Sequence, residues 1–402
     1  MPSPDAHPFA RYTAEVLRFG FAGQAAPAAP APLAPGALRA ARDGCLRALE
    51  REPRASVLLL GLGTGDLARA LDDALPPEVT LVVSELDTAL ARAALAGPDA
   101  PWARPGGRTV LLADTSPWAH FLLWTLHGLT PATAHLRLHP QDQRHPGRAL
   151  ARRLFARAGA LGPAPAQAPF PALTLAAILA PGDPGLEEFF AQVPPWATEV
   201  VALWDADAPP AQHPGCAAPV RHLARPLGDD FAAQRNAMLD ACATDWVLVL
   251  DADERLTPQG WQAARDLARR GQAHGMGLFL LPRRTLHPDG ERVLAGLGLW
   301  PDLQPRLFRR TPALRYQRPV HERLTGARGP FGVALGPSIL HLNRLLRGPD
   351  AVRAKLAGFD RAGAGGVRHT LSADYPALAP ELLPEDAGPG APPAVTLPFD
   401  PA

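Results

Sequence analysis

Short apolar runs alternate with helix-like segments along most of the chain. The runs VLLL at 57–60 and WVLVL at 246–250 are apolar at every position, which is typical of strands buried on both faces of a sheet. Further apolar runs lie at 79–83, 109–113, 173–179 and 199–204, and helical segments at 66–74, 88–95, 184–193 and 231–243. Because strands that alternate with helices form mainly parallel sheets, the pattern predicts an α/β fold in both halves, with a doubly wound, Rossmann-like sheet in the first.

Stretches rich in proline and alanine separate the patterned regions. Such composition favours extended linkers because it packs poorly into helices and sheets. The sequence therefore predicts a Rossmann-like domain at 37–158 and a second α/β domain at 172–365. In this prediction a linker at 159–171 joins them, with an N-terminal extension at 1–36 and a proline-rich tail at 366–402.

Composition and charge narrow the class of protein. Of the 402 residues, 47% are hydrophobic and 20% are charged, so the chain can bury the cores of two or three domains. The 40 basic residues nearly balance the 39 acidic ones, which gives no overall field to attract nucleic acid or an anionic membrane. The first residues lack the pattern of a secretory signal, and no apolar run reaches the roughly 18 residues of a membrane span. We therefore expect a cytoplasmic protein without a nucleic-acid partner or a transmembrane segment, in peripheral contact with the inner face of the membrane if its acceptor lies there.

Two carboxylates follow the buried run at 246–250. Asp251 and Asp253 stand at the end of a strand, where open α/β sheets bind their ligands. A pair of carboxylates there can hold a hard divalent cation, and the cation can neutralise phosphate oxygens. Alternatively, the segment is an acidic turn from strand to helix, with Thr257 as the helix cap and Pro258 at the first helical position.

Four blocks of the C-terminal half occur in the order that one enzyme family shows. They are DFAAQRNAMLDACATDWVLVLDADERLTP at 230–258, WPDLQPRLFRR at 300–310, RPVHERL at 318–324 and ILHLNR at 339–344. In this order and pattern the chain resembles the family 2 glycosyltransferases, particularly the bacterial branch similar to lipopolysaccharide-core glucosyltransferases. The resemblance covers about residues 173–361 and leaves the N-terminal half unassigned.

The resemblance implies a fold, a donor and a set of residues. The family has the nucleotide-sugar-binding GT-A fold and takes nucleotide-diphosphate sugars as donors. Carried onto matching positions, it implies that Asp251 and Asp253 hold Mg²⁺ or Mn²⁺ and that Asp205 reads the nucleotide base. It also implies that Arg235 lines the nucleotide pocket and that His321 contacts the diphosphate or completes the metal shell.

The chemistry implied is transfer of a sugar with inversion at its anomeric carbon. Such a step needs a base for the acceptor hydroxyl, and the candidates are Glu322 and Asp302, of which we favour Glu322. The acceptor implied is a glycan such as a surface polysaccharide, a lipid-linked acceptor or a protein. Two segments, at 181–183 and 204–215, depart from the family's donor-binding motifs. A degenerate GT-A domain that serves as a binding or scaffold module is therefore the alternative function.

Glycines and one acid form a second candidate site in the N-terminal half. Gly61, Gly63 and Gly65 lie between a strand and a helix, and Glu85 follows 24 residues after Gly61. This spacing resembles the first motifs of Rossmann-type methyltransferases that use S-adenosylmethionine, in which the acid meets a ribose. The chain would then be bifunctional. The other interpretation is a glycine turn with a structural role alone.

Overall fold

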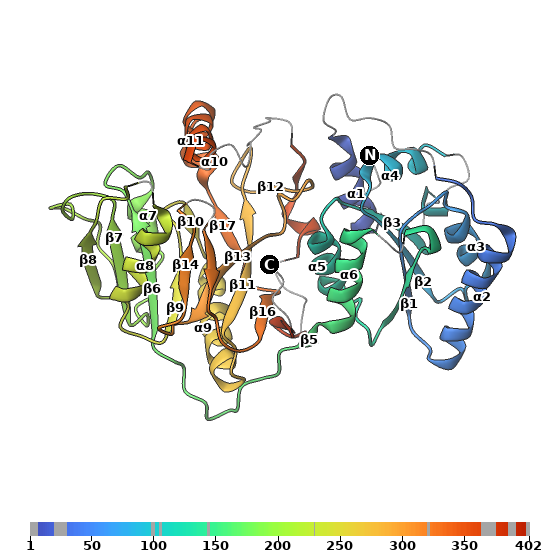
Figure 1. The fold of residues 1–402 in the computed structure, drawn as a ribbon, viewed down its shortest axis with the longest axis horizontal. Coiled ribbons are helices and arrows are strands. Elements are labelled where there is room, and N and C mark those ends of the chain that lie inside the picture. Colours follow the sequence, from blue (N-terminus) through green and yellow to red (C-terminus); the bar gives the residue numbers. More distant parts are fainter. Residues whose placement is uncertain are drawn as a thin grey trace. The chain divides into compact units, whose positions relative to one another are not determined.

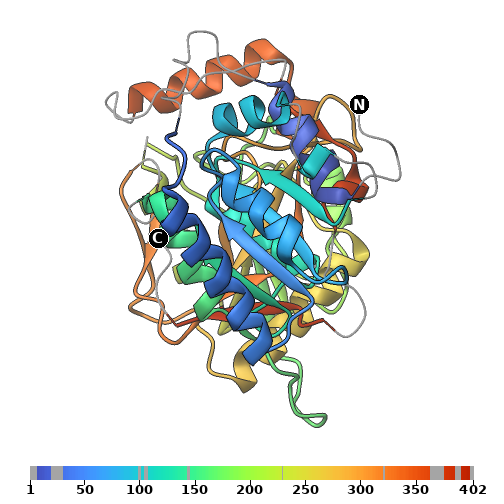
Figure 2. The ribbon, with the colours of Figure 1, turned by 90° about the vertical axis from the view of Figure 1, so that its right-hand side faces the viewer.

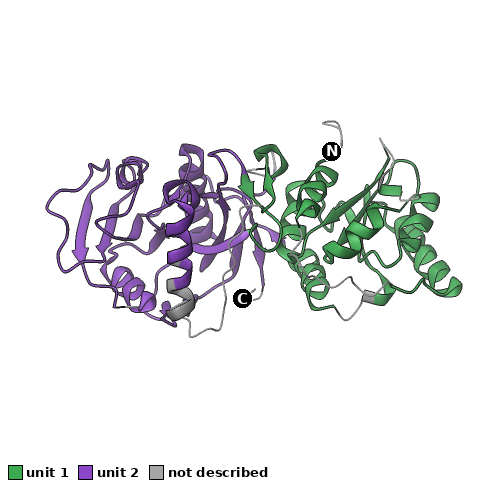
Figure 3. Cartoon of the chain, turned by 90° about the horizontal axis from the view of Figure 1, so that it is seen from above, with its two compact units in different colours: residues 1–158, 293–301, 374–388 green, residues 159–292, 302–373, 389–402 purple. Residues whose placement is uncertain are grey.

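The computed structural model describes most of the chain and divides it into two compact units. The described residues are 7–19, 30–97, 101–103, 107–142, 145–228, 230–319, 322–362, 375–384 and 391–398. Unit 1 comprises Met1–Ala158, Val293–Pro301 and Asp374–Gly388, and unit 2 comprises Gly159–Arg292, Asp302–Ala373 and Pro389–Ala402 (Figure 3). Within the described ranges, no helix is both long and apolar enough to cross a membrane.

This division differs from the contiguous domains that the sequence predicts. Segment Val293–Pro301 falls inside the predicted second domain, yet it belongs to unit 1. There β12 (Val293–Leu294) pairs antiparallel with β18 (Ala377–Leu378), a strand from the predicted tail. The predicted linker also begins with a strand, because β5 (Gly159–Ala160) pairs with β19 (Ala394–Leu397) in unit 2.

Unit 1 is built on a parallel sheet with the strand order β3-β2-β1-β4, as in Rossmann-type sheets. Helices α2 and α3 lie on one side of this sheet and α5 and α6 on the other, which makes it doubly wound (Figures 1 and 2). Its strands are β1 (Ser56–Leu60), β2 (Thr80–Glu85), β3 (Thr109–Ala113) and β4 (Ala134–Leu138). Its helices are α1 (Pro8–Arg18), α2 (Pro35–Arg51), α3 (Asp66–Ala74), α4 (Thr88–Leu95), α5 (Pro117–Leu126) and α6 (Pro146–Arg157), with short 3₁₀ turns at Pro101–Ala103, Pro140–Asp142 and Pro380–Leu382. The predicted α/β fold of this half is confirmed.

Local sequence sets where these helices begin. Asp87 accepts the backbone N–H groups of Ala89 and Leu90 at the start of α4, and Ser116 accepts that of Ala119 at the start of α5. Such caps satisfy donors that have no partner inside the helix. Asp87 and Ser116 follow β2 and β3 closely, so each cap turns the chain from the sheet into a helix.

Helix α1 covers the edge strand β3 through two polar residues. The Thr13 hydroxyl donates to the carbonyl of Leu111 (2.8 Å) and accepts the N–H of Ala113 (3.0 Å). The Tyr12 hydroxyl donates to Oδ2 of Asp114 at 2.5 Å, and both side chains are buried. Burial raises the pKa of Asp114 to about 6, although the bonds from Tyr12 and the Ser116 N–H act in the opposite direction. The rings of Tyr12 and Trp300 lie 6.3 Å apart, so Val293–Pro301 contributes to the packing around α1.

Unit 2 contains a larger mixed sheet. Its path is β5-β19-β16-β11-β13-β9-β6-β7-β8, and β17 pairs with both β10 and β11. Its strands not yet given are β6 (Leu173–Leu179), β7 (Glu199–Trp204), β8 (Val220–Ala224), β9 (Trp246–Val249), β10 (Glu254–Arg255), β11 (Leu278–Thr285), β13 (Asp302–Arg309), β16 (Phe331–Ala334) and β17 (Ile339–His341). Strands β14 (Arg315–Gln317) and β15 (Arg323–Thr325) form a separate hairpin. The helices are α7 (Leu186–Ala191), α8 (Phe231–Ala241), α9 (Pro258–Ala273), α10 (Asn343–Leu346) and α11 (Pro349–Ala362). This half is also α/β, as the sequence predicts.

Apolar residues on both faces of this sheet hold the helices. Phe189 and Phe190 of α7 and Trp261 of α9 belong to one core cluster with β6, whereas Met238 of α8 belongs to a second one. Burial of each such side chain contributes about 1.5–3 kcal/mol to stability. Gly271 of α9 lies so close to the Trp246 ring that a Cβ would come within 2.4 Å of it. The two faces therefore fix the sheet that carries the candidate site.

Candidate functional site

The candidate site lies where several strands of unit 2 meet at one edge of the sheet. Strands β6, β7 and β9 are parallel, so the residues that follow them, including Asp205 and Asp251, leave the sheet at the same edge. Strand β13 runs antiparallel to β9, which brings its first residue, Asp302, to this edge as well. The sequence blocks at 230–258 and 300–310 are thus brought together by the topology.

Asp251 is held by two arginines. Its Oδ1 accepts a hydrogen bond from Nη2 of Arg235 at 3.1 Å, and its Oδ2 accepts one from Nη2 of Arg306. Arg306 also donates to Oε1 of Glu254 at 2.7 Å. The backbone N–H of Asp251 donates to the second oxygen of Glu254, at 3.0 Å, so the two acids are fixed to each other as well as to Arg306.

Further hydrogen bonds of the same kind reach both predicted bases, Asp302 and Glu322. Arg283 donates to Glu254 at 3.1 Å and to Oδ2 of Asp302, where its Nε lies at 2.8 Å. At the other end, Nε of Arg235 donates to Oε1 of Glu322 at 2.6 Å. One continuous set of charge-assisted hydrogen bonds therefore links the two candidates. We call it the ion-pair network; its members are Arg235, Asp251, Glu254, Arg283, Asp302, Arg306 and Glu322.

The ion-pair network is largely withdrawn from solvent. The side chain of Glu254 is fully buried and that of Arg306 is 5% exposed, whereas that of Asp251 is 29% exposed. Burial opposes ionisation of Asp251, but the charges of Arg306 and Arg235 outweigh it and hold the pKa of Asp251 well below its ordinary value. Because removing one partner leaves a buried charge uncompensated, such a network is sensitive to single substitutions.

Helix α8 places Arg235 through its two neighbours in the sequence. Gln234 exchanges two hydrogen bonds with Arg225, at 2.6 and 2.7 Å. Asn236 exchanges two with the backbone of Tyr316, both at 2.9 Å, and the guanidinium carbon of Arg235 lies 5.5 Å from the centre of the Tyr316 ring. Gln234 therefore ties α8 to the residue that follows β8, and Asn236 ties it to β14. Strand β14 pairs with β15, just before which Glu322 lies.

Sequence reasoning leaves Arg306 open between a solvated strand face and a patch for phosphate or an anionic acceptor, and it assigns no role to Arg283. Both are arginines in strands, where charged residues usually face solvent. Alternation along β13 places Asp302 and Gln304 on one face, and Gln304 donates to Oδ1 of Asp302 at 2.6 Å. The register with β11 shifts between Phe279 and Leu280, opposite Arg306, so simple alternation does not extend to Arg306.

Asp205, the predicted contact for the nucleotide base, and Asp183 lie outside the ion-pair network. Oδ1 of Asp205 accepts the backbone N–H of Leu227 at 2.8 Å, so Asp205 fixes the segment between β8 and α8. Asp183, in the first of the divergent segments, accepts the N–H of Ala180 and a hydrogen bond from Arg347, both at 2.7 Å. His321 lies outside the described residues.

The residues present do not fit a Mg²⁺ or Mn²⁺ ion at the predicted pair. A cation at Asp251 would have to displace two guanidinium groups, which hold both of its oxygens. Asp253 is buried, and its Oδ1 lies 3.7 Å from Nε2 of His341, whose Nδ1 is in turn 2.9 Å from the Thr285 hydroxyl. Within the described part of the chain, no three His, Cys, Asp or Glu side chains gather as a metal shell would require.

The N-terminal glycine turn is packed against side chains. Gly61, Gly63 and Gly65 have φ values of 100°, 56° and 79°, which other residues rarely adopt. A Cβ on Gly63 would lie 2.5 Å from the His139 ring, and one on Gly65 would lie 2.9 Å from Trp102. The three glycines are therefore required by the turn and its packing.

Glu85 serves the same turn. Its side chain is fully buried, with Oε2 accepting the N–H of Leu62 at 2.8 Å and Oε1 accepting that of Asp87 at 2.7 Å. Arg148 also donates to Oε1. Because its side chain is fully buried and both oxygens accept hydrogen bonds within unit 1, Glu85 does not fit the predicted contact with the ribose of S-adenosylmethionine.

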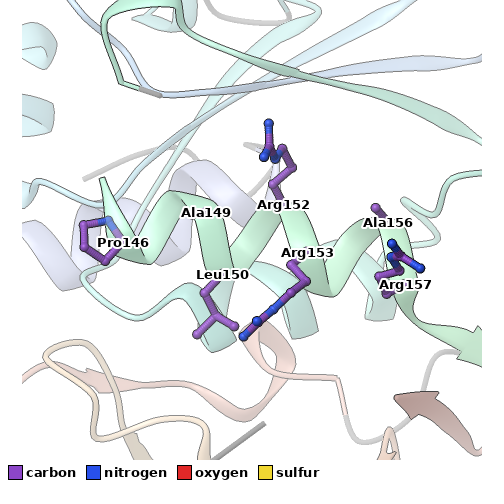
Figure 4. Close-up of a pocket in the computed structure, with 7 residues that line it drawn as sticks. All are labelled: Pro146, Ala149, Leu150, Arg152, Arg153, Ala156 and Arg157. Carbon is purple, nitrogen blue, oxygen red and sulfur yellow. The ribbon is translucent and has the colours of Figure 1, made fainter. Parts of the chain in front are cut away.

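A surface hollow of about 590 Å³ lies along α6 of unit 1. Residues from Pro146 to Arg157 line it, with the side chains of Leu150, Arg152 and Arg153 spread along one helix (Figure 4). None of its lining residues belongs to the ion-pair network or to the glycine turn. The hollow therefore does not mark either predicted site.

Comparison with known proteins gives partial matches. No protein-family model matches the chain. Over 94 residues it is 37% identical to a TPR repeat-containing protein of Synechococcus elongatus, a match that covers 23% of this chain and 21% of that protein. Solved structures of S. aureus TarS, one with UDP-GlcNAc and one with UDP, match at TM-scores of 0.25 and 0.23 with 12% and 11% identity. They cover 37% and 34% of this chain, which in turn spans 49% and 46% of theirs. The chain thus spans about a fifth of the curated relative and less than half of these TarS chains, and TM-scores this low do not establish a shared fold.

Proposed function

We propose that unit 2 is a glycosyltransferase that moves a sugar from a nucleotide-diphosphate donor to a hydroxyl group of an acceptor. The observation that supports this proposal is that three separate sequence blocks meet in the ion-pair network. Arg235 and Asp251 come from the first, Asp302 and Arg306 from the second, and Glu322 from the third. These are the blocks on which the resemblance to family 2 glycosyltransferases depends.

Glu322 is better placed than Asp302 to act as the base. Both oxygens of Asp302 accept hydrogen bonds, Oδ2 from Arg283 and Oδ1 from Gln304. Glu322 accepts one from Arg235 through Oε1, and its Oε2 accepts none from the other residues that the structure describes. A base needs a free oxygen within reach of the proton that it removes, so Glu322 fits this role.

The proposed step inverts the anomeric centre. Glu322 takes the proton of the acceptor hydroxyl while the acceptor oxygen forms its bond to the anomeric carbon. The bond from that carbon to the diphosphate oxygen breaks, and the electron pair leaves with the nucleoside diphosphate. Asp205 at the end of β7 is the proposed contact for the nucleotide base. We propose a glycan acceptor, such as a surface polysaccharide, a lipid-linked sugar or a protein-linked one.

The test is turnover of a panel of nucleotide sugars by the full-length protein. Release of nucleoside diphosphate is measured in EDTA, in Mg²⁺ and in Mn²⁺, because the sequence predicts a cation that the arrangement of Asp251 does not fit. Substitution Glu322→Gln should lower the rate by about 10²-fold or more. The control is Glu187→Gln, on the exposed surface of α7. Absence of turnover with every donor in all three conditions contradicts the proposal.

A binding or scaffold module is the second candidate function. Two observations favour it: Asp251 is already neutralised by Arg235 and Arg306, and Asp183 is held by Arg347. Such a module would bind a nucleotide or a glycan without turnover. Calorimetry with nucleoside diphosphates, combined with the release assay, distinguishes such a module from an enzyme. A module gives a heat of binding but releases no product.

A further inference from the structure

We propose that Arg235 is a positioning residue, which holds Glu322 in place as the base and ties it to the donor end of the site at Asp251. This inference rests on the glycosyltransferase function proposed above. Resemblance to the family implies only that Arg235 lines the nucleotide pocket. In the structure, two of its donor groups are instead committed to the two carboxylates.

The contacts of Arg235 use the shape of its guanidinium group. Nε lies 2.6 Å from Oε1 of Glu322, and Nη2 lies 3.1 Å from Oδ1 of Asp251. A guanidinium group presents its N–H donors in one rigid plane, so a single side chain can orient two carboxylates at once. Lysine carries the same charge as a point donor on a flexible stem and cannot reproduce this geometry.

The plane of the guanidinium group is itself fixed by its surroundings. The side chain is 11% exposed, and its guanidinium carbon lies 5.5 Å from the centre of the Tyr316 ring. Tyr316 is in turn bound through its backbone by Asn236, the next residue after Arg235 on α8. Arg235 is therefore held between a helix and a strand that are clamped beside it, which limits how far Glu322 can move.

Arg235 holds Oε1 of Glu322, and Oε2, which accepts no hydrogen bond from the other described residues, is the oxygen that would meet the acceptor. A correctly oriented base contributes to the rate of the chemical step rather than to substrate affinity. Loss of Arg235 should therefore lower kcat strongly. It also removes the guanidinium group that joins the carboxylates of Glu322 and Asp251, so the orientation of Glu322 is lost even where the fold persists.

The experiment compares Arg235→Ala with a matched control. In the control Arg315→Ala, an exposed arginine loses its contact with Asp240 (2.9 Å), a contact that links the same helix and strand, α8 and β14. Nucleoside diphosphate release from a donor that the wild-type protein turns over gives kcat and KM, with water as the acceptor. Arg235→Ala should lose about 10²-fold in kcat, and added guanidinium chloride at non-denaturing concentration should restore kcat at least about tenfold. Arg315→Ala should keep wild-type kcat, and Glu322→Gln should gain nothing from guanidinium.

A second variant covers the case in which Arg235→Ala does not fold. Arg235→Lys keeps the positive charge and should keep a melting temperature close to that of the wild type, yet lose at least about tenfold in kcat. Full kcat in Arg235→Lys overturns the inference, and so does a folded Arg235→Ala that guanidinium fails to rescue. Both results leave the glycosyltransferase function standing, since it requires only turnover by the wild-type protein. Lack of wild-type turnover refutes that function, and the inference falls with it.

Discussion

Asp114 gives unit 1 a stability that falls as the pH rises. Its carboxyl group has an ordinary pKa of 3.8, and burial raises the pKa to about 6 in the folded protein. Below pH 3.8 the group is protonated in both the folded and the unfolded chain. Between these values the unfolded chain releases the proton and the folded one does not, so unfolding becomes more favourable. Asp114 therefore lowers the free energy of unfolding by about 3 kcal/mol in total as the pH rises, and about 2.4 kcal/mol of this loss falls between pH 4 and pH 7.

Substitution Asp114→Asn should remove this dependence. The amide stays neutral at every pH, and its oxygen can still accept the N–H of Ser116, which lies 2.7 Å from Oδ1 of Asp114. Loss of the titrating group removes only the part of the pH dependence of the unfolding free energy that Asp114 contributes. The contributions of other groups, such as His120 with a pKa that burial lowers to about 4, cancel when the two proteins are compared at each pH.

The assay is urea unfolding at pH 4 to 8 with pulse-labelling hydrogen exchange. Peptides from α1 and β3 report the unfolding of unit 1, which tryptophan fluorescence cannot separate from that of unit 2. We expect the difference in unfolding free energy between wild type and Asp114→Asn to change by about 2 kcal/mol or more from pH 4 to pH 7, in favour of the variant at the higher pH. Parallel curves for the two proteins would show that Asp114 is not a desolvated acid.

Three further predictions concern particular side chains. Gly63→Ala should destabilise unit 1 by at least about 2 kcal/mol, because the φ of 56° is strained for alanine and the new Cβ meets the His139 ring; urea unfolding of that unit measures it. Thr13→Val should cost about 1–3 kcal/mol, since it removes both hydrogen bonds that the hydroxyl makes to β3, and exchange of α1 amides with deuterium should speed up accordingly. Burial raises the pKa of Cys242 to about 12, so a disulfide reagent at pH 8 should modify the more exposed Cys216 and leave Cys242 intact, as mass spectrometry of the native protein would record.

The sequence predicts which parts of the chain meet better than it predicts which atoms do. Apolar runs give the strands, and parallel strands bring Asp205 and Asp251 to one edge because of topology alone. The partners of these acids depend on side chains from distant segments. Arg306, 55 residues after Asp251, donates a hydrogen bond to one oxygen of Asp251. Arg148, 63 residues after Glu85, donates one to Glu85, the acid whose spacing suggests a contact with a ribose. Spacing along a chain carries no information about such competition.

The boundaries between the two units do not all coincide with the stretches rich in proline and alanine, for a related reason. Strands β12 and β18 are two residues long, too short to show any alternation of apolar and polar positions. Their pairing nevertheless assigns Val293–Pro301 and Asp374–Gly388 to unit 1. Pairing between short segments is decided by the surrounding fold, so local sequence does not reveal it.

The interleaving of the two units constrains how the protein is made. The polypeptide passes from one unit to the other at Ala158, Arg292, Pro301, Ala373 and Gly388. During synthesis, the first 158 residues leave the ribosome long before Trp300, which is 1% exposed in the finished fold, and before the strand at Ala377–Leu378. Until these segments are synthesised, the apolar residues of unit 1 that they cover stay exposed, a state that favours chaperone binding. For the same reason, a gene cut after codon 158 would separate unit 1 from two of its segments, although the part after residue 158 would still contain all of unit 2.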